Sequence, residues 1–155
     1  MRKLLLALLL GVTFVNAQTE EKKPLFYVSE GLNPYVLTFF EVMQADEWIM
    51  SKFLAKDFAV VLSHDFEVDI KDHAGEARGM YDDDRVLVII NTDAWVKLED
   101  FEKQDLINHE LMHDMFNVEH VDGEDELMHP SSYPKSWGDT MQRLVGAIND
   151  LNKNI

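Results

Sequence analysis

The spacing of apolar side chains predicts three helices along the chain, with short strands between the first and the second. Apolar residues recur at intervals of three and four in each helical stretch, and Asn33-Pro34 is typical of a helix start. We expect the helices from Asn33 to about Leu54, at Leu98–Phe116 and at Trp137–Asn152. Runs of β-branched and alternating residues predict strands at Phe58–Leu62, Glu67–Ile70 and Val86–Asn91.

The order of these elements indicates an α+β fold in one domain. A small twisted sheet would be backed by the first helix, with the second helix beneath it and the third closing the chain. The segment 71–84 contains two glycines and an acidic run, so we expect a hairpin or a loop there, and Val121–Pro134 is expected to be a loop. No repeat or linker is visible, so we expect residues 18–155 to form the folded unit.

The N-terminal residues have the pattern of a secretory signal peptide. Arg2 and Lys3 precede the apolar run Leu4–Val15, and Val15-Asn16-Ala17 supplies the small residues of a cleavage site. The run is too short to span a membrane comfortably, which argues against an uncleaved anchor. We expect residues 1–17 to be removed and the mature chain to be exported to the periplasm or the medium. The chain has no cysteine, so a lipid anchor is not expected.

Composition narrows the set of partners. Removing seventeen residues from the chain of 155 leaves 138, which is enough for one core. The loss of Arg2 and Lys3 changes the formal net charge from −15 to −17. Such a surface should repel nucleic acid and anionic lipid and attract cationic peptides, although solubility alone is the simpler interpretation of the acidic balance. We expect no nucleic-acid partner, no membrane span in the mature chain, a monomer, and stability without disulfides.

One short motif carries the candidate chemistry, the pentapeptide His109-Glu110-Leu111-Met112-His113. Histidines four residues apart lie on one face of a helix, about 6 Å apart along its axis, so both can bind one metal ion. Glu110 would lie on the flank, where it can act as the general base toward a metal-activated water. The simplest alternative is a helix with surface histidines, but four of the six histidines fall within residues 109–129.

A third ligand has to come from beyond this helix. Asn117 tolerates the left-handed conformation that ends helices, and the turn would bring His120 back toward the helix axis. Three protein ligands leave one position open for water, as catalytic rather than structural zinc requires. Glu119 is the main competitor to His120 as third ligand. His129 could also compete for the metal, but a fourth histidine would close the site.

This part of the chain resembles the metzincin clan of zinc endopeptidases, whose pattern is HExxHxxGxxH followed by a methionine-containing turn. Asn117 would occupy the glycine position with one residue added before it, and His120 keeps the clan's distance of three residues from that position. Glu126-Leu127-Met128-His129-Pro130 resembles the methionine turn. The spacing is also similar to that of small secreted bacterial metallopeptidases. The motif-bearing match covers about residues 86–133.

The resemblance implies a zinc-dependent endopeptidase with a metzincin-like fold. One Zn²⁺ would be held by His109, His113 and His120, and Glu110 would be the catalytic base that activates water for attack on a peptide or protein substrate. Two rival functions are a zinc-stabilised binding protein or inhibitor that cleaves nothing, and an acidic Ca²⁺-binding exported module. The intact Glu110 argues against the first, because a structural site does not need it.

Four further assignments are weaker. By resemblance, Met128 would form an apolar floor under the histidines. Tyr133 is a candidate oxyanion stabiliser, although a surface tyrosine in a loop is the simpler interpretation. Substrate would lie along Val86–Asn91 if this strand forms an exposed sheet edge. A structural Ca²⁺ could bind at Asp82-Asp83-Asp84 or within Asp122–Glu126, but solvated acidic loops are the simpler interpretation for both.

Overall fold

The computed structural model describes residues 25–43, 56–70, 72–122, 126–130 and 133–153. The helices in these ranges are α1 (Asn33–Val42), α3 (Thr92–Trp95), α4 (Asp100–Phe116) and α5 (Trp137–Lys153), and the 3-10 turns are η1 (Glu30–Leu32) and η2 (Ser63–Phe66). The strands are β1 (Phe26–Val28), β2 (Asp57–Leu62), β3 (Gly75–Ala77) and β4 (Arg85–Ile90). The expected signal peptide and the second half of the first predicted helix lie outside the described residues.

The four strands form one mixed sheet in the order β1-β2-β4-β3. Strands β1, β2 and β4 are parallel, and β3 pairs antiparallel with β4, with Glu76 opposite Ile89. The prediction that Val86–Asn91 is an exposed edge is therefore wrong, because β4 has a neighbour on each side. The edge strand next to β4 is β3, which lies in the segment predicted as a hairpin or loop.

Side-chain alternation divides the sheet into two buried faces. Phe58 and Val60 of β2, with the even-numbered residues of β4, face the main core, which they share with the helices. Val61 and Ile89 face the other side and pack with Ile70 in a smaller cluster. The mixed α/β architecture agrees with the predicted α+β class at this level of detail.

The predicted strand Glu67–Ile70 is wrong, and its apolar residues have another use. Glu67 has a left-handed conformation with φ 53°, and the Val68 amide bonds back to the Ser63 carbonyl at 3.0 Å. The chain therefore turns after β2 instead of extending beside it. Val68 and Ile70 then cover the second face of the sheet, which explains an alternating pattern without strand pairing.

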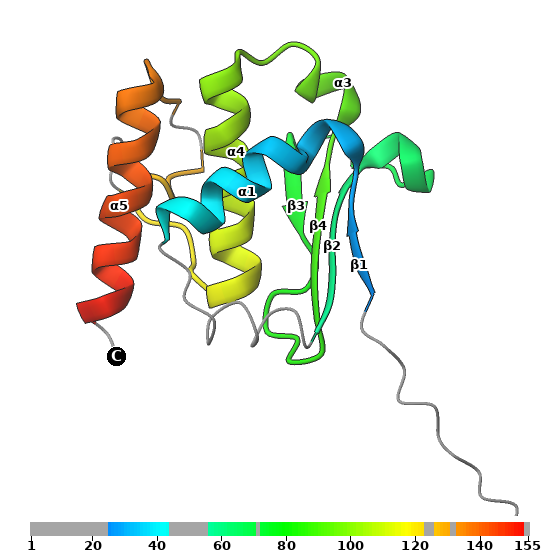
Figure 1. Ribbon diagram of the computed structural model, residues 1–155, viewed down its shortest axis with the longest axis horizontal. Coiled ribbons are helices and arrows are strands. Elements are labelled where there is room, and N and C mark those ends of the chain that lie inside the picture. The colour runs from blue at the N-terminus through cyan, green and yellow to red at the C-terminus, as the bar shows by residue number, and fades with distance from the viewer. Residues whose placement is uncertain (1–24, 44–55, 71, 123–125, 131–132, 154–155) are drawn as a thin grey trace, which may run out of the picture.

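The helices gather on one side of the sheet, with α4 between the sheet and α5, and α1 crossing α4 (Figure 1). Helix α4 begins at Asp100, two residues after the predicted start, because Glu99 and Glu102 form a capping box. It ends where predicted, since Asn117 has φ 54° and its amide bonds to the His113 carbonyl. Both ends of the helix that carries the pentapeptide are thus fixed by local chemistry.

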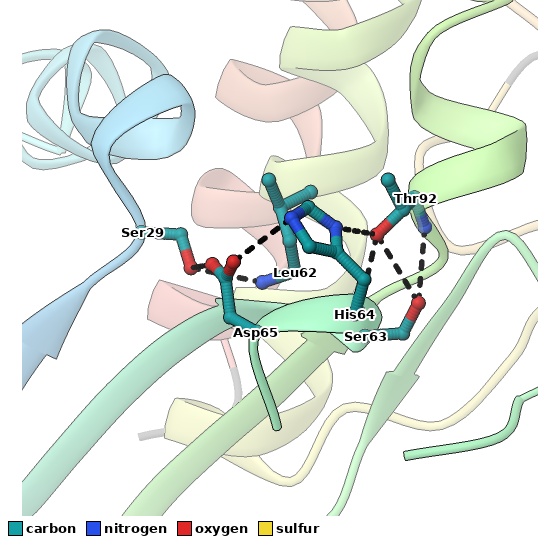
Figure 2. A network of polar contacts seen from close by, with 6 residues as sticks. All are labelled: Ser29, Leu62, Ser63, His64, Asp65 and Thr92. Carbon is teal, nitrogen blue, oxygen red and sulfur yellow. Dashed lines mark hydrogen bonds and ion pairs between the residues drawn. The ribbon is translucent and has the colours of Figure 1, made fainter. Parts of the chain in front are cut away.

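A polar network ties together the carboxyl ends of the three parallel strands (Figure 2). The His64 ring meets the Thr92 hydroxyl at 2.7 Å on one side and the Asp65 carboxylate at 2.9 Å on the other. Asp65 accepts a hydrogen bond from Ser29, which follows β1, and Ser29 accepts one from the Leu62 amide. Although these residue types resemble a hydrolytic triad, their bonds join strand ends, and we assign the network to the sheet.

Candidate metal centre

Helix α4 and the turn after it bring three histidines together. His109 and His113 lie one turn apart on α4, and the left-handed Asn117 reverses the chain so that His120 returns beside them. The three Nε2 atoms form a triangle. His113 Nε2 lies 3.0 Å from His109 Nε2 and 3.0 Å from His120 Nε2, and the third side measures 3.2 Å. These three histidines are the one potential metal-binding group of this kind within the described residues.

The contacts of the Nδ1 atoms determine the protonation of the Nε2 atoms that face one another. His109 Nδ1 lies 2.7 Å from the Leu127 carbonyl oxygen, and His113 Nδ1 contacts the Val118 carbonyl oxygen. A carbonyl only accepts, so both Nδ1 atoms carry the proton, and both Nε2 atoms present lone pairs in the neutral rings. Two lone pairs facing each other at 3.0 Å cannot share a hydrogen bond. The arrangement is therefore suited to a cation that accepts electron density from all three rings.

The triangle is close to the size of a zinc site and slightly smaller. Ligand nitrogens at 2.0–2.1 Å in a tetrahedron are separated by about 3.3–3.4 Å. The observed separations of 3.0–3.2 Å differ from that by a few tenths of an ångström. Burial lowers the pKa of His109 to about 4, and it also lowers that of His113. Both rings are thus neutral near pH 7 and ready to bind metal.

Glu110 is buried beside this cluster and faces β3. It accepts a hydrogen bond from the Ala77 amide, and burial is the main cause that raises its pKa to about 8. Gly75 makes room for it, because a Cβ atom there would lie 2.7 Å from the Glu110 side chain. A cation held by the histidines would favour the ionised carboxylate. Glu110 is therefore a positioned acid–base group at the boundary between helix and sheet edge.

Asp114, one helical turn after Glu110, fixes the same face of α4 to the sheet. Its Oδ2 atom accepts hydrogen bonds from the amides of Gly79 at 2.6 Å and Leu87 at 3.2 Å. A Cβ atom at Gly79 would lie 2.5 Å from the Asp114 carboxylate. Sequence reasoning missed this role of Asp114 and the edge strand beside it. A signal was present in the two glycines, since a glycine often marks a place where another part of the chain approaches the backbone closely, here Glu110 at Gly75 in β3 and Asp114 at Gly79 just after it.

The two competing ligands line the cleft that contains the three histidines but are not part of their cluster. Glu119 accepts a hydrogen bond from the Tyr81 hydroxyl at 2.9 Å and is outside the group of three histidines. His129 lines the same cleft but is also outside that group. At the first proposed Ca²⁺ site, Asp82 forms an ion pair with Arg85 at 2.8 Å and accepts a hydrogen bond from the Asp84 amide. The second includes residues 123–125, which lie outside the described residues.

Comparison of the chain with models of protein families, with curated proteins and with solved structures finds no match. Within the described residues, no helix has the length and apolarity needed to cross a membrane.

The two remaining predicted residues differ in their surroundings. Met128 is 3% exposed and belongs to the main core, and its carbonyl accepts the Val121 amide at 3.1 Å. The preceding residue, Leu127, supplies the carbonyl that holds His109. Tyr133 is 72% exposed and lines the cleft that contains the histidines and Glu110. Met128 is thus placed to support the loop behind a candidate ligand, whereas Tyr133 stands at the rim of the cleft.

Burial of Met128 gives a prediction about stability. Met128→Leu conserves volume and apolarity, so we expect it to lower the free energy of unfolding by less than about 1.5 kcal/mol. Met128→Ala should leave a cavity and cost about 2–5 kcal/mol. Thermal and chemical unfolding of both variants, with and without chelator, measures the difference. Equal stability of the two variants would mean that residues 126–130 do not pack as described.

Proposed function

We propose that this protein is a zinc-dependent endopeptidase. The observation that carries the proposal is the close approach of three histidine Nε2 atoms beside a buried glutamate, in a cleft bordered by a sheet edge. Three imidazoles suit zinc, and three ligands leave a position for water, which distinguishes catalytic from structural sites. The metzincin-like sequence pattern supports the same proposal.

Each of the residues at the site has a distinct role in the proposed reaction. When bound, zinc would polarise the peptide carbonyl and lower the pKa of its water to about 7. Glu110 accepts the proton of the attacking water and returns it to the leaving amine. The Ala77 amide holds the Glu110 carboxylate in position. The carbonyls of Leu127 and Val118 keep His109 and His113 in the tautomer that binds metal through Nε2.

The sheet edge at β3 offers a path for an extended substrate. The Ala74 carbonyl and the Arg78 amide bond to β4, so the backbone groups of Gly75 and Ala77 point toward the free edge. The Ala77 amide is engaged by Glu110, which leaves the Ala77 carbonyl and both backbone groups of Gly75 for a peptide. We propose that substrate pairs here by main-chain hydrogen bonds, beside Glu110.

Metal removal tests the proposed function. The protein without residues 1–17 should contain about one zinc per chain and should cleave an unstructured peptide library. Dialysis against chelator should abolish cleavage, and stoichiometric zinc should restore it. Metal content is measured by mass spectrometry and cleavage by product sequencing. Bound zinc without cleavage would favour a zinc-stabilised binding protein or inhibitor, and absence of both would contradict the metal centre.

A further inference from the structure

The charged side chains that line the cleft around the histidines are all acidic. The described residues that line it include six acidic side chains and neither lysine nor arginine. The acids are Asp72, Glu76, Glu102, Asp105, Glu110 and Glu119. Several are already engaged, since Glu76 pairs with Arg78, Glu102 caps α4 and Glu119 accepts from Tyr81. The overall sign favours cationic groups, but a specific site needs an acceptor that is still open.

Asp105 provides that acceptor. It lies on α4 four residues before His109, hence on the same helical face, and it lines the cleft. Its side chain is only 9% exposed. The Oδ2 atom lies 3.1 Å from the Arg143 guanidinium, whereas the buried Oδ1 atom has no hydrogen-bond partner among the described residues. A buried carboxylate oxygen without a donor costs free energy until a ligand or water supplies one.

The surroundings leave this carboxylate incompletely compensated. Burial raises the pKa of Asp105 to about 7, even though Arg143 acts in the opposite direction. Arg143 is itself shared, because it also donates to the Glu126 carbonyl at 2.8 Å. None of the described residues that line the cleft is a lysine or an arginine. A second cation entering from the cleft would meet Asp105 one helical turn from the histidine cluster, where Oδ1 is buried and has no donor among the described residues.

We propose that Asp105 is a specificity-determining residue that selects substrates with a lysine or arginine side chain next to the scissile bond. The inference rests on the proposed function, because it assigns the substrate class of the same cleft. An ammonium or guanidinium group would donate to Oδ1, and the acidic lining would attract it to the cleft. A glutamate at the same substrate position would be repelled by the acidic side chains that line the cleft, so we expect such peptides to be poor substrates.

The test compares peptides that differ at one position beside the scissile bond. Lysine, arginine, norleucine and glutamate are placed there in turn, and kcat/KM is measured for the zinc-loaded protein. A hydrogen bond to a charged group contributes about 1.5–3 kcal/mol, so lysine or arginine should exceed norleucine by about 10–100-fold. Asp105→Asn should remove most of that preference while leaving norleucine cleavage within a few-fold. Asp93→Asn, on the exposed surface, controls for the loss of one negative charge.

Asp105→Asn weakens a buried ion pair and could fail to fold, so a second variant is needed. Asp105→Leu combined with Arg143→Met removes both charges and should also abolish the preference. Unfolding curves establish that each variant is folded. Persistence of the lysine preference in either folded variant, or equal cleavage of lysine and norleucine peptides by the wild type, would overturn the inference and leave the peptidase proposal intact.

A binding experiment tests the selectivity for lysine or arginine independently of the proposed peptidase activity. Peptide affinities are measured by calorimetry on the zinc-loaded Glu110→Gln variant, which does not depend on turnover. Tighter binding of the lysine peptide, lost on adding Asp105→Asn, supports the selectivity even if the wild type cleaves nothing. Equal binding of all four peptides would contradict it.

Discussion

Glu110→Gln should bind zinc like the wild type and lose about 10²–10⁴-fold in kcat, because the attacking water loses its base. The substitution keeps the shape of the side chain, and the glutamine carbonyl can still accept the Ala77 amide. Burial of Glu110 raises its pKa, so an uncharged side chain is tolerated there and the free energy of unfolding should not fall. Metal content, unfolding curves and single-turnover cleavage of one peptide provide the three measurements.

The matched control is Glu119→Gln, which makes the same chemical change nine residues further along, on an exposed side chain bonded to Tyr81. It should retain cleavage within a few-fold. Full activity of Glu110→Gln with normal zinc content would remove the proposed mechanism. A loss of zinc equal to the loss of activity would instead make Glu110 part of the metal site.

His120→Ala should reduce zinc affinity by more than the roughly 10–100-fold expected for losing a residue that only hydrogen-bonds a ligand. His120 closes the triangle of Nε2 atoms at 3.0 and 3.2 Å from the other two. It is exposed, so its removal should not unfold the metal-free protein. Competition with a chromophoric chelator near pH 7 measures the affinity.

Glu119→Gln again serves as the comparison, since it tests the neighbouring carboxylate as a ligand. Its zinc affinity should stay within about tenfold of the wild type, because the Glu119 carboxylate accepts a hydrogen bond from Tyr81 and is not part of the histidine cluster. If Glu119→Gln released the metal while His120→Ala kept it, the third ligand would be the carboxylate.

Sequence pattern predicted the elements that have a strong local signal. The core strands β2 and β4, the body of the helix α4 and the left-handed Asn117 at its end all follow from periodicity and end chemistry, whereas the capping box at its start was not predicted. Strand β3 was not predictable in the same way, because three residues such as Gly75–Ala77 show no alternation. Its extended form depends on pairing with β4 and on the helix beside it. Tertiary contacts here override a weak local preference.

The candidate site likewise contains residues that local sequence predicts and others that it does not. The pentapeptide placed His109, Glu110 and His113 correctly on one helix, and the spacing brought His120 back to them. The open oxygen of Asp105 could not be foreseen, because its partner Arg143 lies on another helix 38 residues away. Local spacing therefore predicts the histidine cluster, whereas the polar groups around it depend on how distant helices and strands pack.

Two of the histidine rings hold the same loop at points nine residues apart, His113 through the Val118 carbonyl and His109 through the Leu127 carbonyl. An ion that fixes both rings would therefore also restrain the backbone at Val118 and at Leu127. Because the chain has no cysteine to form disulfides, the proposed metal would then also protect its backbone from digestion. Protein that lost the ion would be the first to be degraded, so the population that persists in the presence of proteases would be the metal-bound one.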